Sequence, residues 1–458
     1  MFDINEVAQL LSGKLGRYRA DHIEVHLEET EASAVSYRGR ELETATRTRD
    51  SGGNVRAMVN GGWGFVSFNS LDGIEKRIEQ AVGQARLVGK GGGEFSNVPP
   101  VTDEVVINES HDPRRVSLAD KKALLDEYND TLWSIDGLQT SSIGYGDGRK
   151  KAILLTSDGS FISQERADIT LRVNAVAAGG GEVQQSGISM GSRGNFEDIK
   201  GLHGRVKETA ERAVALLKAP QAKGGEYTVV LDPVLAGVFV HEAFGHLSEA
   251  DHIYENPQLK EVMVLGREFG GEHLNIIDDA TMVNLRGGYV YDDEGTPGQR
   301  IHLIRDGKLS GRLHSRETAA KMKEAPSGNA RAISFRHPPI VRMGNTFIEP
   351  RDVNFDQMIG DIKEGIYARN WYGGTTSMEM FTFSAGEAFM IRNGKVEELI
   401  RPVVLSGNVF ETLKRIDAIG NDLDMNQGGG CGKGGQSPLA VSNGSPHIRI
   451  QQCLIGGR

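Results

Sequence analysis

The sequence is poor in cysteine and lacks long apolar runs. Its 458 residues include only two cysteines, Cys431 and Cys453, which excludes a disulfide framework of the kind that stabilises small secreted proteins. No stretch approaches the roughly 20 apolar residues of a membrane-spanning helix. The first residues also lack the basic and then apolar pattern of a secretory signal. We therefore expect a cytoplasmic protein that has no membrane partner.

Basic residues are also fewer than acidic ones, with 52 lysines and arginines against 62 aspartates and glutamates. The formal net charge is −10 and the isoelectric point is near 5.7, which argues against a general binder of nucleic acid or anionic membranes. Glycine, by contrast, is abundant, with 59 residues spread over many turns. This distribution favours a hairpin-rich β protein over a disordered chain. From the acidic charge balance we expect no direct nucleic-acid partner.

The chain is too long for one hydrophobic core, and two segments with linker composition divide it. Residues 89–100 are rich in glycine and contain two adjacent prolines, and residues 220–225 form a shorter linker. We predict an α+β fold in which two small α+β units precede a β-rich C-terminal domain that carries the metal-site helix described below. The predicted domains are residues 1–90, 115–219 and 226–456.

Apolar periodicity predicts one helix before and one helix after the strands of each small unit. The predicted helices span residues 4–16, 71–88, 117–134 and 195–217. Between them, alternation of apolar and polar residues predicts strands that are separated by glycine-containing turns. Two of these strands, at residues 22–28 and 34–37, are predicted to be separate.

The most informative segment is an H-E-x-x-x-H pattern made by His241, Glu242 and His246. It follows a predicted strand at residues 227–232 and an apolar helix at residues 233–240. Zinc hydrolases need neutral imidazoles that hold the metal, together with a carboxylate that takes a proton from metal-bound water. The pattern by itself is compatible with a metal site and also with a helix end whose histidines bond to backbone.

The spacing of the two histidines predicts an irregular helix. The helix is expected to begin at Pro233, with Asp232 as its N-cap. His241 and His246 are five residues apart, and five residues turn a regular helix by roughly 140°, so the two rings would diverge. A π-bulge, or a helix that ends at Gly245, would bring both rings to one point.

A second informative segment, centred on Cys431, supplies a third candidate ligand. Residues 426–436 contain six glycines around Cys431, and a loop of this kind lets the backbone approach a ligand closely. It contains no G-K-[ST] sequence and is therefore not a P-loop. As a thiolate, Cys431 is the best candidate for a third zinc ligand. Cys453 is interpreted as a buried core thiol.

Three further polar segments have open roles. Glu249, Asp251 and His252 are candidate ligands, or residues that orient ligands. The acidic loop at residues 291–298 lacks the alternating oxygen ligands of an EF-hand, so we interpret it as a structured active-site loop. The arginines of residues 331–351 either recognise a substrate carboxylate or pair within this acidic chain, and the second use is the commoner one. From these segments, the candidate substrate-binding residues are Asp293, Arg342 and Asn345.

Four segments, in order along the chain, resemble the TldD/PmbA family of metallopeptidases. They are the H-E-x-x-x-H pattern, residues 292–295, residues 342–345 and residues 431–433. The resemblance covers nearly the whole chain. In this family the TldD type of subunit carries the H-E-x-x-x-H pattern and the late cysteine, whereas the PmbA (TldE) type lacks both. The chain therefore resembles the TldD type.

The resemblance implies a cofactor, an activity and a partner. His241, His246 and Cys431 would bind Zn²⁺, and Glu242 would activate the metal-bound water. The substrates would be short peptides or unfolded protein, cleaved inside an enclosed dimer. The second subunit of this dimer would be either a TldE/PmbA-type subunit or a second copy of the chain.

Two alternatives remain open from the sequence. A metal amidohydrolase that acts on non-peptide substrates could use the same ligands. A binding or scaffold subunit, including one with a gyrase-related role, would hold only a structural metal, and such sites usually have four protein ligands. Glu249 and His252 are the residues that could supply a fourth ligand.

Overall fold

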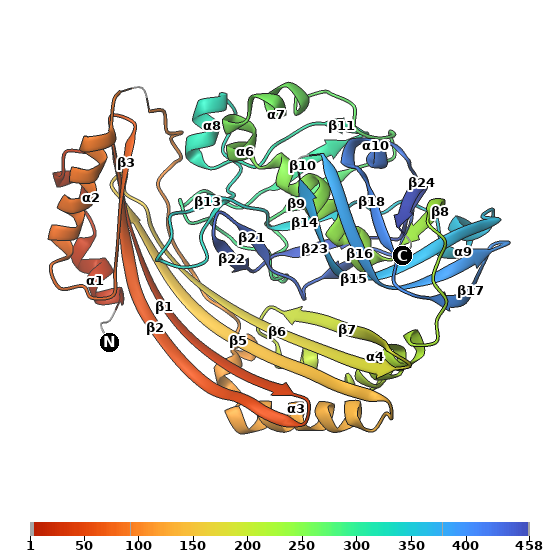
Figure 1. Ribbon diagram of the computed structural model, residues 1–458. Helices are drawn as coiled ribbons and strands as arrows, with labels where there is room; N and C mark the ends of the chain where they lie inside the picture. Colours follow the sequence, from red (N-terminus) through yellow and green to blue (C-terminus); the bar gives the residue numbers. More distant parts are fainter. Residues whose placement is uncertain (1–3, 92, 378, 457–458) are drawn as a thin grey trace.

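The computed structural model describes residues 4–91, 93–377 and 379–456. A long, strongly curved sheet is built from the first half of the chain, and the C-terminal part lies on its concave side (Figure 1). The sheet has the strand order β3-β2-β1-β5-β6-β4, and β7 also pairs with β6. Its strands are β1 (His22–Arg38), β2 (Glu41–Val59), β3 (Gly62–Phe68), β4 (Thr102–Val105), β5 (Leu138–Thr156), β6 (Phe161–Gly179) and β7 (Glu182–Ser192).

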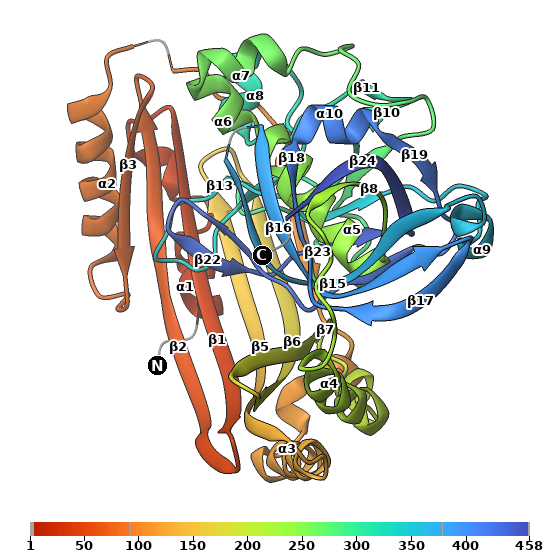
Figure 2. The ribbon, with the colours of Figure 1, turned by 45° about the vertical axis from the view of Figure 1, so that its right-hand side comes forward.

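The strands of the two small units share this one sheet. β1 pairs with β5 along almost its whole length, from Glu24 opposite Thr156 to Arg38 opposite Ser142. Figure 2 shows the long strands running side by side beneath the C-terminal part. The domain boundaries stay a prediction, but residues 1–90 and 115–219 contribute to a common layer.

The prediction of separate strands at residues 22–28 and 34–37 was wrong, because β1 is continuous through both. The intervening residues 29–33 include neither glycine nor proline, and β2 and β5 pair with them on both sides. Paired backbone groups on both sides keep a polar segment extended where local propensity is weak.

Two pairs of helices cover the sheet at its two ends (Figure 1). At one end are α1 (Ile4–Leu11) and α2 (Ile74–Val88), and at the other are α3 (Leu118–Trp133) and α4 (His203–Leu216). Each pair packs its apolar stripe on a separate hydrophobic cluster. The predicted helix at residues 195–217 is interrupted, since Gly201 has a φ of +69° and α4 begins only at His203.

The C-terminal part contains two larger sheets. The first has the order β15-β8-β24-β18-β16-β17, and β19 also pairs with β24. Its strands are β8 (Gly225–Leu231), β15 (Glu364–Ser377), β16 (Met380–Arg392), β17 (Lys395–Ile400), β18 (Val404–Asn408), β19 (Ile416–Ile419) and β24 (Ile448–Gly456). The second has the order β11-β10-β9-β14-β23-β20. Its strands are β9 (Ile276–Asp279), β10 (Arg300–Arg305), β11 (Lys308–Leu309), β14 (Asn345–Ile348), β20 (Asp424–Asn426) and β23 (Ser442–Ser445).

Helix α5 (Pro233–Val240) lies between these two sheets, because it contacts β15 of the first and β14, β20 and β23 of the second. Two short hairpins flank the region, β12 (Ala330–Arg331) with β13 (Ile340–Val341) and β21 (Cys431–Lys433) with β22 (Gln436–Leu439). The remaining helices are α6 (Ala250–Glu255), α7 (Pro257–Val262), α8 (Arg316–Met322), α9 (Phe355–Ile359) and α10 (Val409–Lys414). The architecture is α+β, as predicted.

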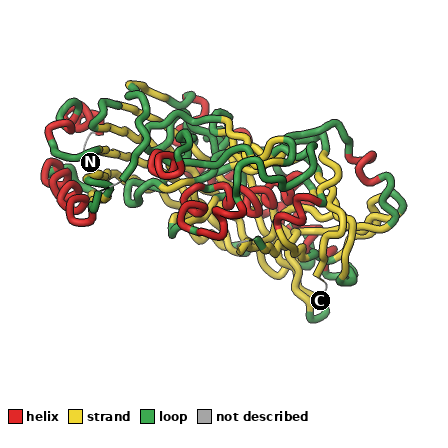
Figure 3. Tube along the Cα trace, turned by 90° about the horizontal axis from the view of Figure 1, so that it is seen from above, coloured by secondary structure: helices red, strands yellow, loops and turns green. Residues whose placement is uncertain are grey.

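The molecule is elongated when seen from above, and the marked chain ends lie toward its opposite ends (Figure 3). No helix in the described ranges is both long enough and apolar enough to cross a membrane. The apolar core of the C-terminal part includes one face of α5 and strands of both sheets. The end of α5 is therefore packed inside this part of the protein.

Candidate metal centre

The helix that carries the histidine motif begins as the sequence predicts. Asp232 caps it, since its Oδ1 accepts a hydrogen bond from the backbone N–H of Leu235 at 2.9 Å, and Pro233 occupies the first helical position. After Val240 the backbone forms a π-helical turn at His241–Gly245 and a 3₁₀ turn at His246–Ser248. The predicted irregularity between the histidines is confirmed.

One backbone hydrogen bond closes the wide turn, and a glycine lets it pack against the rest of the protein. The backbone N–H of His246 bonds to the carbonyl of His241, five residues earlier, so the turn holds one residue more than an α-helical turn. Gly245 permits this packing because a Cβ at that position would overlap the Met343 sulfur. As a result, the ring centroids of His241 and His246 are 5.2 Å apart.

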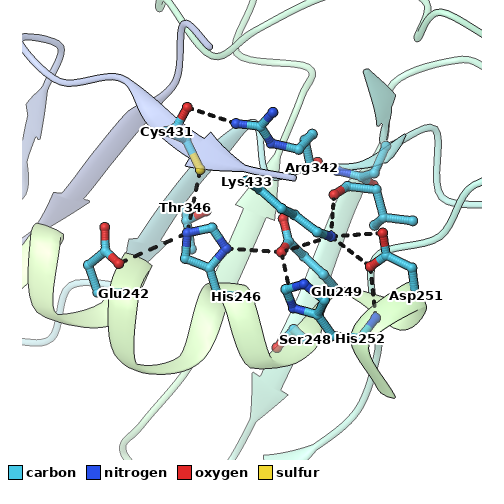
Figure 4. Close-up of polar contacts among 12 residues, drawn as sticks. Glu242, His246, Ser248, Glu249, Asp251, His252, Arg342, Thr346, Cys431 and Lys433 are labelled. Atoms are coloured by element: carbon cyan, nitrogen blue, oxygen red, sulfur yellow. Dashed lines mark hydrogen bonds and ion pairs between the residues drawn. The ribbon is translucent and has the colours of Figure 1, made fainter. Parts of the chain in front are cut away.

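The glycine-rich segment brings Cys431 to the two histidines (Figure 4). The Cys431 Sγ lies 3.5 Å from His246 Nε2, and one potential ligand atom from each of Cys431, His241 and His246 lies within 4.8 Å of the others. His241 is almost completely buried, and its Nδ1 has no hydrogen-bond partner. Two imidazoles, one thiol and an unpartnered buried nitrogen fit the donor set that zinc prefers.

The two neighbouring histidines make the Cys431 thiol more acidic. Burial alone raises its pKa, but His241 and His246 outweigh burial and lower the pKa to about 5. Cys453 has no such neighbours, and burial raises the pKa of its thiol to about 12. A thiolate is the form of cysteine that binds metal. The surroundings of the two cysteines therefore differ: those of Cys431 favour the thiolate, and those of Cys453 favour the neutral thiol.

Glu249 contacts the candidate ligand His246 and is not one of the three residues that converge. Its Oε2 lies 2.9 Å from His246 Nδ1, so this nitrogen donates to the carboxylate and Nε2 is left facing Cys431. Burial raises the pKa of Glu249, but the charges of His246, Lys433 and His252 lower it to about 2. Of all described residues, only His241, His246 and Cys431 form a group of three that could hold a metal ion.

Glu242 lies beside this group on the wall of a cavity. Its Oε2 is 4.0 Å from His246 Nε2, and about a third of its side chain is exposed. The cavity has a volume of about 420 Å³, and His241 also lines it. Apolar and aromatic side chains, among them Val238, Trp371 and Tyr372, form other parts of the wall. This carboxylate therefore lies next to the candidate metal ligands and is open to a cavity large enough for a small molecule or a peptide segment.

The three candidate substrate-binding residues do not line this cavity. Arg342 is fully buried, and its guanidinium donates to the Cys431 carbonyl at 2.7 Å. Asn345 is also fully buried and donates to the Asp279 carbonyl at 2.7 Å. Asp293 accepts a hydrogen bond from the backbone N–H of Ala332. Their role in substrate binding stays a prediction, and the observed contacts favour a structural role.

The neighbouring acidic loop and arginines are likewise used internally. Asp292 accepts hydrogen bonds from the backbone N–H groups of Glu294, Thr296 and Ala330, so it closes its own turn. The guanidinium of Arg331 donates to the backbone carbonyls of Met343 and Ala440. These hydrogen bonds of Arg331 are internal, but they go to backbone carbonyls and not to acidic side chains. Arg336 does pair with an acidic residue, Asp50, at 2.6 Å, as the internal-pairing interpretation expects.

Two residues that hold the cysteine loop have no sequence signal beyond their charge. Lys433 donates to Asp251 Oδ1 at 2.7 Å and reaches Glu249. Arg286 donates to the carbonyls of Gln427 and Gly429 and pairs with Asp168 of β6. Their partners lie 92 or more residues away in the sequence. The one hint that the sequence offers is that Lys433 follows Cys431 by two positions.

Comparison with known proteins agrees with this geometry. Three family models match the chain in succession, described as PmbA/TldA metallopeptidase domain 1 at residues 23–85, central domain at residues 111–217 and C-terminal domain at residues 224–457. The chain belongs to the PmbA/TldD family of metallopeptidases. Within it, several relatives carry the name TldD homolog, in line with the resemblance to the TldD type.

Relatives of this family are similar over nearly the whole chain. A metalloprotease from Synechocystis is 47% identical, covering 97% of this chain and 96% of the relative. A zinc metalloprotease TldD homolog from Saccharolobus solfataricus is 31% identical, covering 89% of this chain and 90% of the relative. The solved structure of TldE from Thermococcus kodakarensis has a TM-score of 0.80 at 17% identity and covers 98% of this chain and all of that one. At this identity the likeness shows a shared fold.

Proposed function

We propose that this chain is a zinc-dependent peptidase that hydrolyses short or unfolded peptides. The observation that carries the proposal is the convergence of His241, His246 and Cys431 beside Glu242, which together with His241 lines one cavity. These three ligands would hold the metal. The name of the Saccharolobus solfataricus relative supports zinc as the ion.

The chain's own residues have distinct roles in this proposal. A zinc ion bound there would supply a Lewis acid that polarises a peptide carbonyl and makes water more acidic. Glu242 Oε2 would take a proton from the attacking water and pass it to the leaving amine. Glu249 would keep a proton on Nδ1 of His246, so that Nε2 stays available as a ligand atom. The cavity beside Glu242 would hold the substrate segment that includes the scissile bond.

We further propose that the working form is a dimer whose active site is enclosed. The second subunit would be a TldE/PmbA-type protein or another copy of this chain. The shared fold with TldE from Thermococcus kodakarensis supports a related pairing surface without choosing between these two. Size-exclusion chromatography with light scattering would give the stoichiometry of the chain alone and mixed with such a subunit.

The ligand count bears on the alternatives. A structural zinc site usually has four protein ligands. In the described part of the chain, Glu249 faces the far nitrogen of His246 and His252 lies 3.9 Å from Glu249, so neither joins the three ligand atoms. This supports a hydrolytic site with an open position over a structural site. A screen of peptides against small amides separates a peptidase from a metal amidohydrolase.

The test is metal content and peptidase activity of the purified chain, with and without a TldE-type subunit. We expect one zinc per chain, retained in Glu242→Ala, lost in Cys431→Ser, and unchanged in the matched control Cys453→Ser. Glu242→Ala should lower kcat/KM by about 10²- to 10⁴-fold, the usual contribution of a general base. Full activity in Glu242→Ala would overturn its role, and no bound zinc after reconstitution would overturn the metal site.

A further inference from the structure

Lys433 connects the strand that carries the cysteine to the helical segment that carries His246. Its Nζ donates to both carboxylate oxygens of Asp251, at 2.7 Å and 2.8 Å. It also donates to the Val341 carbonyl, at 2.8 Å. It also lies 3.1 Å from Glu249 Oε2. The three donor positions of the ammonium group are therefore used by three different residues.

These contacts are made inside the protein. The Lys433 side chain is 7% exposed and that of Glu249 is fully buried. A buried ammonium group that lost these partners, or a buried carboxylate that lost Lys433, would be left with an uncompensated charge. The arrangement therefore specifies one relative position of the strand and the helical segment.

Both ends of this connection belong to the proposed metal site. Figure 4 shows Cys431 and Lys433 extending from the same strand toward the segment of His246 and Glu249. The Glu249 oxygen that Lys433 contacts is the one that lies 2.9 Å from His246 Nδ1. The ammonium group of Lys433 thus contacts the Glu249 carboxylate, which pairs with His246. In the sequence, Lys433 follows Cys431 by two residues.

We propose that Lys433 is a positioning residue of the metal centre, which fixes Cys431 and His246 relative to each other through Glu249 and Asp251. The inference rests on the proposed zinc site and deepens it. Lys433 does not touch the ligand group itself, since its partners are Glu249, Asp251 and the Val341 carbonyl. Its effect should therefore appear in the affinity and geometry of the metal site.

The test compares zinc affinity of Lys433→Met with that of the wild type, by competition with a chromogenic chelator. Loss of a residue that supports metal ligands typically lowers affinity 10- to 100-fold, and we expect a loss in this range. Lys433→Arg, which retains the charge, should recover most of the affinity. In the cobalt-substituted protein, Lys433→Met should also alter the sulfur-to-cobalt charge-transfer band that reports on Cys431.

Lys121 provides a matched control. Lys121 of α3 is fully buried and pairs with Asp147 of β5 at 2.6 Å, and neither residue belongs to the group of candidate metal ligands. Lys121→Met should lower thermal stability and leave zinc affinity unchanged. If Lys433→Met does not fold, Asp251→Asn weakens the same connection from its other end and is expected to lower zinc affinity several-fold.

The outcomes separate this inference from the proposed function. One outcome would overturn the role of Lys433 alone. In that outcome the wild type binds zinc, and Lys433→Met and Asp251→Asn bind it equally well and show the same cobalt spectrum. Equal losses of zinc affinity in Lys433→Met and Lys121→Met would also overturn it, because the effect would then be general destabilisation. Wild-type protein that binds no zinc would overturn both proposals.

Discussion

Arg56 and Glu294 form a 2.7 Å ion pair although 238 residues separate them in sequence. Arg56 also pairs with Glu24 at 3.1 Å, and its guanidinium lies 3.9 Å from the centre of the Trp63 ring. All three charged side chains are buried. Because Arg56 is in β2 and Glu294 is in the acidic loop, this cluster joins the curved sheet to the C-terminal part.

Replacing Arg56 by Met should destabilise the protein strongly. It leaves the carboxylates of Glu24 and Glu294 buried without their cation, a change that typically costs about 3–5 kcal/mol. Urea unfolding followed by circular dichroism measures this loss. Arg38→Met is the control, because Arg38 pairs with Glu43 at the surface and should change stability by less than about 1 kcal/mol. Equal midpoints for the two variants would contradict the prediction.

Two adjacent glycines should respond very differently to alanine. A Cβ on Gly428 would overlap the backbone of Ser189 in β7, whereas a Cβ on Gly429 would meet only the Asn443 amide nitrogen, at 3.9 Å. Gly428→Ala should therefore push the loop that leads to Cys431 away from β7, and lower both thermal stability and zinc affinity. Gly429→Ala should resemble the wild type. Calorimetry and chelator competition on the same two proteins check both effects.

Asp232 should make stability depend on pH. Burial raises the pKa of its carboxyl to about 6, against the lowering effect of the Leu235 and Asn370 N–H groups. The folded state therefore holds a proton more tightly than the unfolded state, whose pKa is about 3.9. The resulting cost is absent below pH 4, grows between pH 4 and pH 6, and stays constant above that range.

Asp232→Asn should remove this cost while keeping an oxygen that can cap α5. We expect it to raise the free energy of unfolding at pH 8 by as much as about 3 kcal/mol and to have little effect near pH 4. The exposed Asp130→Asn is the control and should show no comparable gain at pH 8. A pH-independent difference between Asp232→Asn and the wild type would show that the carboxylate charge is not its cause.

In metal-stripped protein one cysteine should be ionised at neutral pH. With a pKa of about 5, Cys431 should contribute thiolate absorbance near 240 nm at pH 7, which disappears as the pH falls below 5. Cys453, whose pKa is about 12, should contribute none at pH 7. The signal should therefore be absent in Cys431→Ser and intact in Cys453→Ser. Equal absorbance in both variants would contradict the assignment.

Local sequence determined the helix that carries the histidines. Asp232 and Pro233 start α5 because a side-chain acceptor and a pre-set φ suit its first turn. The five-residue spacing of His241 and His246 required a wide turn, and the structure has one. The glycines around Cys431 marked a segment that could approach a ligand closely, although not the partner it would meet.

Tertiary structure decided what lies next to that helix. The long strand β1 exists as one element because β2 and β5 pair with it on both sides, and periodicity within residues 22–38 does not contain that information. The contact of Cys431 with His246 joins residues 185 positions apart, and it depends on how β20 and β23 pack against α5. Lys433 with Glu249 and Arg56 with Glu294 are decided in the same way. A buried charge must find an opposite charge somewhere, but only the packing of distant elements selects which one.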